Sequence, residues 1–156
     1  MGSENMVTGI LIFNTYSEDF FSADRYVAKL NQKLKFIKAY SEEVIIVSNV
    51  PELLLPHTPR NIRIITEYYK GKGVIGRLHA GLSLSSYPTN IVIHFDTLPD
   101  DINLPHVLNR FYLTKSDLIL FDPSYLNGIY RKSIVPLLAH ALEQESSTHN
   151  AFEKLN

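Results

Sequence analysis

Short, continuous apolar runs alternate along this chain with segments of helical periodicity, and this alternation constrains the fold more than any other feature. The runs at 7–13 (VTGILIF) and 44–48 (VIIVS) are rich in β-branched residues and too short for typical helices. Unbroken apolar strands of this kind are covered on both faces, as in parallel sheets. Further strands are predicted at 62–66, 91–95, 118–121 and, for a short one, 127–130.

Helical segments are predicted between these strands. They cover 24–40, 77–86, 105–112 and 133–144, whereas the proline-containing stretch 51–59 is expected to be irregular. In the last helix, Ile134, Leu137, Leu138 and Ala141 are expected to face the core. Strands alternating with helices predict one α/β domain over 1–156, with three layers (α/β/α), a mostly parallel sheet and a Rossmann-like build.

The composition excludes several classes of protein. A formal net charge of −1 leaves no basic footprint for nucleic acid or for an anionic membrane surface. No apolar run approaches the length of a membrane span, and no secretory signal pattern is visible. The chain has no cysteine, which excludes disulfides and thiol chemistry. With no export signal visible, the cytoplasm is the expected location.

A glycine-rich stretch between the third strand and the following helix is the clearest candidate binding motif. Gly71, Gly73 and Gly76 form a literal G-x-G-x-x-G, and Lys72 and Arg77 add cationic donors. Such a loop can bring backbone N–H groups and a helix N-terminus to a phosphate. As a dinucleotide-binding turn it has a flaw, because four residues separate the strand from Gly71. We therefore rank a dinucleotide-binding domain third among the possible functions.

Asp96 follows the strand at 91–95, about twenty positions after Gly76. A carboxylate at the end of a parallel strand is well placed to hold Mg²⁺ together with phosphate oxygens of a substrate. A loop aspartate that caps a turn is the competing interpretation. His94 is a conceivable additional ligand, although a strand histidine with ordinary hydrogen bonds is more common. Arg25 and Lys29 lie one turn apart on the first predicted helix and could point at a phosphate.

Taken in order, these segments resemble one family. The stretch 71–101 is similar to the core of the molybdenum cofactor guanylyltransferase (MobA) family, in which a G-P-L-x-G loop and an A-G-L helix precede a strand that ends in Asp-Met-Pro or Asp-Thr-Pro. The matching pieces are GVIG (73–76), AGL (80–82) and Asp96-Thr97 followed closely by Pro99. The strands at 8–12 and 44–49 and the late segment 127–133 resemble the corresponding parts of the family.

The resemblance implies a divergent, C-terminally short member with a nucleotidyltransferase fold. It also implies transfer of GMP from Mg·GTP to molybdopterin, with other molybdenum cofactor proteins as possible partners. Asp96 corresponds to the metal-binding aspartate, and the loop 73–77 to the one that contacts the guanine nucleotide. In this interpretation Arg25 or Lys29 neutralises the pyrophosphate.

An alternative stays open, because the family's first strand runs into a glycine-rich phosphate loop and the segment 14–24 has no glycine. In that alternative, the chain binds a nucleotide or a partner without performing chemistry.

Overall fold

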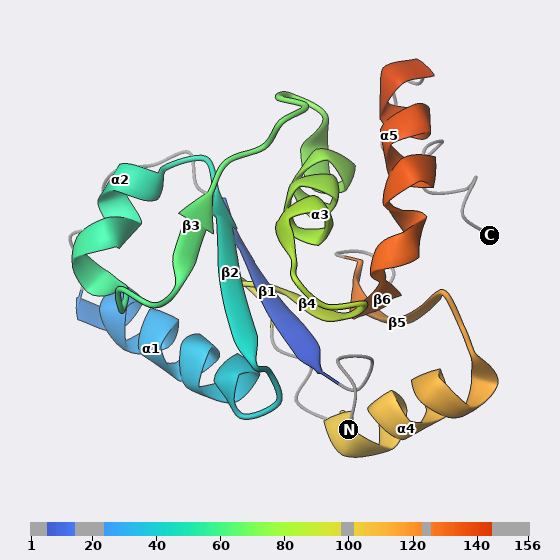
Figure 1. The fold of residues 1–156 in the computed structure, drawn as a ribbon. Coiled ribbons are helices and arrows are strands. Elements are labelled where there is room, and N and C mark those ends of the chain that lie inside the picture. Colours follow the sequence, from blue (N-terminus) through green and yellow to red (C-terminus); the bar gives the residue numbers. More distant parts are fainter. Residues whose placement is uncertain (1–5, 15–23, 98–101, 123–125, 145–156) are drawn as a thin grey trace.

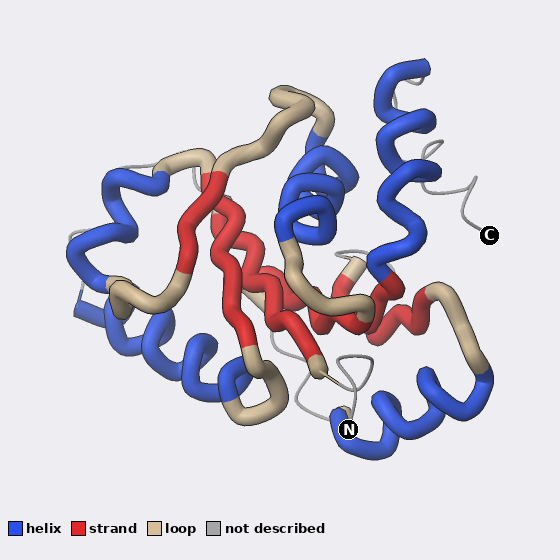
Figure 2. Tube along the Cα trace, in the orientation of Figure 1, coloured by secondary structure: helices blue, strands red, loops and turns tan. Residues whose placement is uncertain are grey.

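The computed structural model describes residues 6–14, 24–97, 102–122 and 126–144, which form a six-stranded sheet in the order β3-β2-β1-β4-β6-β5 (Figure 1). The strands are β1 (Val7–Phe13), β2 (Glu43–Ser48), β3 (Arg63–Ile65), β4 (Thr89–His94), β5 (Leu118–Asp122) and β6 (Asn127–Arg131). The helices are α1 (Asp24–Lys38), α2 (Pro51–Leu54), α3 (Gly73–Leu84), α4 (Leu104–Thr114) and α5 (Val135–Gln144), with short 3₁₀ turns η3 (Leu55–His57) and η4 (Lys132–Ile134). Figure 2 shows how the helices and strands follow one another along the chain.

The sheet is mostly parallel, as predicted. β1 lies at its centre and pairs in parallel with β2 and β4, and β2 pairs in parallel with β3. β6 runs antiparallel to both β4 and β5. The start of β6 therefore lies at the same edge of the sheet as the carboxyl ends of β1, β2 and β4. Because β1 has neighbours on both sides and helices on both faces, all seven of its residues are buried.

Helices cover both faces of the sheet, which confirms the three-layer α/β/α architecture. α3 and α5 lie on one face of the sheet (Figure 1). There Ile10, Ile12 and Val47 belong to the same buried cluster as Leu78 and Leu138. On the other face α1 packs over Leu11, Phe13 and Ile46 of β1 and β2, and α4 packs over Ile91 and Ile93 of β4. None of the helices in this described part of the chain is long and apolar enough to cross a membrane.

Two glycines permit the close contact between helices and sheet. A Cβ on Gly81 of α3 would lie 2.7 Å from Ile10 Cγ2, and a Cβ on Gly9 of β1 would lie 2.6 Å from Ile37 Cγ1 of α1. Either side chain would force the helix away from the sheet. The A-G-L triplet noted in the sequence therefore has a packing function.

Three predictions about local structure were wrong. The stretch 51–59 was expected to be irregular, but it contains α2 and η3, because Pro51 and Pro56 occupy first-turn positions that tolerate proline. α3 begins at Gly73 rather than at Arg77, so four of the six residues 71–76 are helical. Leu137 was expected in the core but is 56% exposed, since α5 buries the stripe formed by Leu138, Ala141 and Leu142.

Candidate functional site

The candidate site lies at the carboxyl edge of the parallel strands, where several polar residues follow strand ends. Asn14 follows β1, Asn49 follows β2 and Thr66 follows β3, while Asp96 comes shortly after β4. Asn127 joins them from the start of the antiparallel strand β6. Ligands of open parallel sheets bind at this edge.

Asp96 lies in the turn that directly follows β4, where Thr97 N–H donates to the His94 carbonyl oxygen at 3.2 Å. Its side chain is 65% exposed, and its Oδ1 lies 4.0 Å from Nζ of Lys29 on α1. The Lys29 ammonium also lies 4.9 Å from the centre of the Phe95 ring, a favourable cation–π distance. Two of the residues predicted from the sequence are therefore close together and accessible.

A magnesium ion at this place would need ligands from its substrate. In the part of the chain that the structure describes, no three His, Cys, Asp or Glu side chains form a group that could hold a metal by themselves. Asp96 fits a Mg²⁺ site that combines one carboxylate with phosphate oxygens and water. Asp100 and Asp101, considered as further carboxylates, lie outside the described residues.

His94 is engaged in the protein interior rather than at the exposed site. The residue is 9% exposed, and its Nδ1 lies 3.1 Å from Oδ1 of Asn127. β4 ends at His94 and the chain then turns, so Asp96 is not part of the strand. His94 therefore lies beneath the turn 95–97, in the protein interior, and not among the exposed groups of the site.

The three glycines of the predicted loop occupy different structural positions. Gly71 (φ +75°) and Gly73 (φ +67°) have the left-handed backbone conformation that glycine adopts without strain. Gly76 lies inside α3, where a Cβ would approach the Tyr69 carbonyl oxygen to 2.8 Å. β3 ends at Ile65 and α3 starts at Gly73, so the strand does not turn directly into the helix as a dinucleotide-binding turn requires.

The two cations of the glycine stretch differ in their surroundings. Lys72 is half-buried at the N-cap position of α3. Arg77 faces Glu67 with 3.9 Å between its Nη1 and Oε1, and both side chains are only 12% exposed. The pair holds the segment 66–72 against α3, and it presents Glu67 as a fixed acceptor.

A cavity of about 250 Å³ opens next to the glycine stretch. It is lined by residues at or after the ends of β2 and β3 and by the start of the glycine stretch with the residue before it: Ser48, Asn49, Thr66, Glu67, Lys70 and Gly71. Sequence reasoning missed the first four of these residues. The rule that pointed to Asp96, a polar residue directly after a predicted strand, applies equally to Asn49 and Glu67, which follow the strands predicted at 44–48 and 62–66.

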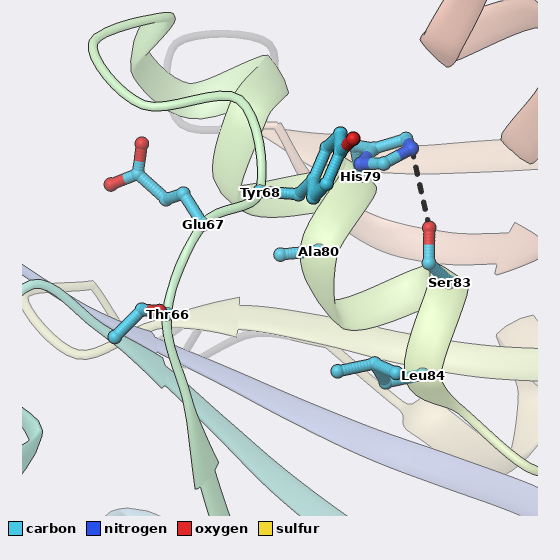
Figure 3. A pocket seen from close by; sticks show the side chains of 7 residues that line it. All are labelled: Thr66, Glu67, Tyr68, His79, Ala80, Ser83 and Leu84. Carbon is cyan, nitrogen blue, oxygen red and sulfur yellow. Dashed lines mark hydrogen bonds between the residues drawn. The ribbon is translucent and has the colours of Figure 1, made fainter.

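A second cavity, of about 440 Å³, lies between the segment 66–68 and α3 and is lined by Thr66, Glu67, Tyr68, His79, Ala80, Ser83 and Leu84 (Figure 3). The side chain of Glu67 points away from His79 and Ser83 in this view. His79 Nε2 lies 3.3 Å from the Ser83 hydroxyl, and burial lowers the pKa of the imidazole below its ordinary value. The lining of this cavity is mostly apolar.

Tyr69 connects the segment 66–72 to α5. Its hydroxyl donates to Oε1 of Glu143 at 2.6 Å, and this hydrogen bond raises the pKa of Tyr69 to about 12. The ring also makes an edge contact with His79. Arg25, the other predicted phosphate ligand, lies at the start of α1, and its side chain is outside the described part of the structure.

The nature of this site can be compared with known proteins. No protein-family model matches the chain, and no curated protein matches its sequence. Solved structures do match. The molybdopterin-guanine dinucleotide biosynthesis protein A of Archaeoglobus fulgidus is 17% identical, with a TM-score of 0.66 over 95% of this chain and 80% of that one.

Two further structures show related folds with bound ligands. A CMP:2-keto-3-deoxy-manno-octonic acid synthetase in complex with CTP is 10% identical, with a TM-score of 0.62 over 96% of this chain and 84% of that one. Rv0371c of Mycobacterium tuberculosis in complex with manganese is 9% identical, with a TM-score of 0.59 over 96% of this chain and 81% of that one. At these identities the likeness is one of fold, and the chain has the α/β/α fold of the nucleotidyltransferases.

Proposed function

We propose that this protein transfers GMP from Mg·GTP to the phosphate of a molybdopterin-like acceptor and releases pyrophosphate. The observation that carries the proposal is the meeting of Lys29 and Asp96 at the carboxyl edge of the sheet, the edge at which the glycine stretch also leads from β3 into α3. Support comes from the fold shared with a molybdopterin-guanine dinucleotide biosynthesis protein and from a nucleotide and a divalent metal in two other proteins of this fold. The proposed setting is the cytoplasm.

Each charged group has a part in this reaction. An acceptor phosphate oxygen attacks the α-phosphorus of GTP, and the bond to the β-phosphate oxygen breaks, so that pyrophosphate leaves with the bonding electrons. Lys29, and Arg25 from the start of the same helix, neutralise the charge that builds on the leaving pyrophosphate. Asp96 would hold Mg²⁺, which supplies further charge neutralisation at the phosphates when bound.

The cavity of about 250 Å³ is our proposed site for the guanine base. A carboxylate offers two acceptor oxygens, and guanine presents two adjacent donors, N1–H and the 2-amino group. Glu67 lines this cavity and is held by Arg77. The backbone amides of Gly71, Lys72 and Gly73 and the side chains of Lys72 and Arg77 are the proposed nucleotide-binding groups of the glycine stretch. The amide of Gly76 is used within α3, so the proposed part of Gly76 is to let the segment 66–72 pack close to the helix.

Calorimetry with GTP, with and without Mg²⁺, tests the proposal. We expect GTP binding that Mg²⁺ strengthens in the wild type, and the loss of that metal dependence in Asp96→Asn. Asp117→Asn is a matched control, because Asp117 is an exposed aspartate that also faces a cation, Arg131, at the opposite edge of the sheet. The absence of GTP binding at millimolar nucleotide would overturn the proposal.

A second assay separates chemistry from binding. Incubation with GTP and molybdopterin should release pyrophosphate and form the guanine dinucleotide. Metal-dependent GTP binding without transfer would instead support the alternative that arises from the glycine-free segment 14–24, a protein that binds the nucleotide without catalysis.

A further inference from the structure

We propose that Asn127 and Lys33 are positioning residues, which fix the turn 95–97 from two sides and thereby place the Asp96 carboxylate. The inference rests on the proposed function for the metal at Asp96, and it assigns a part in that site to two residues that do not themselves touch the ligand. Lys33 belongs to no recognisable motif, and the resemblance noted for the segment 127–133 assigns no such part to Asn127.

Asn127 ties the two ends of the turn together. Its Oδ1 accepts a hydrogen bond from the backbone N–H of His94 at 2.8 Å, and its Nδ2 donates to Oγ1 of Thr97 at 2.6 Å. His94 is the last residue of β4, and Thr97 follows the turn. Asn127 is 1% exposed, so both bonds are shielded from competing water.

The position of Asn127 follows from the topology of the sheet. Asn127 is the first residue of β6, and β6 runs antiparallel to β4. A strand in this direction starts at the edge where its parallel neighbours end. The amide therefore reaches the turn from within the sheet, on a rigid element.

Lys33 holds the same turn from the helix layer. Its Nζ donates to the Thr97 carbonyl oxygen at 2.6 Å, and the residue is only 5% exposed. An ammonium group is costly to bury unless its donors are satisfied, so this bond constrains the backbone of Thr97. Lys29, one turn earlier on α1, faces Asp96 itself. The helix thus sets the distance between the leaving-group cation and the metal-binding carboxylate.

The Asp96 side chain depends on this support. Its carboxylate is mostly exposed and lies 4.0 Å from Lys29, at the limit of an ion pair. Its place is therefore set chiefly by the backbone that carries it. Metal ligands must be held to within about 0.5 Å, and outer groups that orient them are typically worth 10–100-fold in affinity.

The experiment measures Mn²⁺ affinity by electron paramagnetic resonance in the presence of GTP, using the full chain. Asn127→Ala should weaken Mn²⁺ binding about tenfold, while metal-free GTP binding changes little. Asn90→Ala is the matched control. Asn90 is also a fully buried asparagine of the β4–β6 pair, but it donates to the Tyr130 carbonyl oxygen at the opposite end of the strands. The Asn90→Ala variant should lower the free energy of unfolding without changing the Mn²⁺ affinity.

Two milder variants, both at Thr97, test the proposal in the case in which Asn127→Ala does not fold. Thr97→Ala removes the hydroxyl to which Asn127 donates and should weaken Mn²⁺ binding several-fold. Thr97→Ser retains this hydroxyl and should bind Mn²⁺ with the affinity of the wild type. Lys33→Met should weaken Mn²⁺ binding in the same way. Equal Mn²⁺ affinities in Asn127→Ala and Asn90→Ala, or in both Thr97 variants, would overturn the positioning role alone. A wild type without metal-dependent GTP binding would overturn both proposals.

Discussion

Lys29 on α1 and Asp96 after β4 face each other across the carboxyl edge of the sheet, with 4.0 Å between Nζ and Oδ1. Both side chains are largely exposed, at 41% and 65%, and an ion pair of this kind adds little to stability. The value of the pair lies in its charges, which are available to a ligand. This separation of stability from function allows the site to be tested by substitution.

Lys29→Gln should therefore reduce transfer from GTP at least tenfold and leave the free energy of unfolding within about 1 kcal/mol of the wild type. The measurements are pyrophosphate release and urea unfolding. Lys35→Gln, an exposed lysine on the same helix, serves as the control and should change neither. Equal effects of the two variants on transfer would remove Lys29 from the mechanism.

Glu67→Gln should weaken discrimination between guanine and hypoxanthine. Inosine triphosphate lacks the 2-amino group, so the wild type should prefer GTP by about tenfold if the Glu67 carboxylate receives both donors. The glutamine variant should lose most of this preference, as measured by competition binding. Glu52→Gln, an exposed glutamate on α2, should retain it. An unchanged preference in Glu67→Gln would place the base elsewhere.

Glu43 at the amino edge of the sheet should make stability depend on pH in the acid range. Burial acts to raise the pKa of its carboxyl, but hydrogen bonds from Ser86 and Thr8 and the charge of Arg63 lower it overall. The unfolded state then binds the proton more readily, so the contribution is present above about pH 4.5 and is lost as the pH falls through the folded pKa. Glu43→Gln should cost about 2 kcal/mol at pH 7 and flatten this dependence in urea titrations. An equal acid sensitivity in wild type and variant would contradict the assignment.

His79 should make the stability of the fold depend on pH in a higher range than Glu43 does. Burial lowers its pKa in the folded state, against an opposing influence of Glu143, so the unfolded state binds a proton more readily. The stability associated with the neutral imidazole is present above about pH 6.5 and is lost as the pH falls below that value. Urea midpoints at pH 7.5 and 5.5 should differ less in His79→Gln than in the wild type. His140→Gln, which changes an exposed histidine on α5, should behave as the wild type does.

Much of the fold could be predicted, because apolar periodicity is a local property of the chain. The first strand was predicted with the bounds of β1, and the strand at 44–48 lies within β2. The rule that parallel strands end at one edge also led to Asp96, which lies at that edge close to Lys29 and is a residue of the candidate site. The start of α3 was missed, because glycines usually interrupt helices, whereas Gly76 is required here by the nearby Tyr69 carbonyl oxygen.

The parts of the fold and of the candidate site that could not be predicted depend on contacts between residues that are far apart in the sequence. Arg77 has the spacing of a surface cation, and its burial against Glu67 follows from how the segment 66–72 folds back on α3. The support of the turn by Asn127 requires β6 to run antiparallel, and the short run 127–130 does not specify strand direction. Ser48 and Thr66 resemble ordinary turn-forming residues until the cavity brings them together.

The outer strand β3 has a consequence for association between chains. It has only three residues, forms one border of the sheet, and begins with the exposed Arg63, whose guanidinium bonds both Glu43 and the Leu84 carbonyl oxygen. A border this short and charged offers few unpaired amides to a strand from another molecule. The side of the sheet that carries the proposed base cavity is thus protected against the edge-to-edge pairing that leads to aggregation.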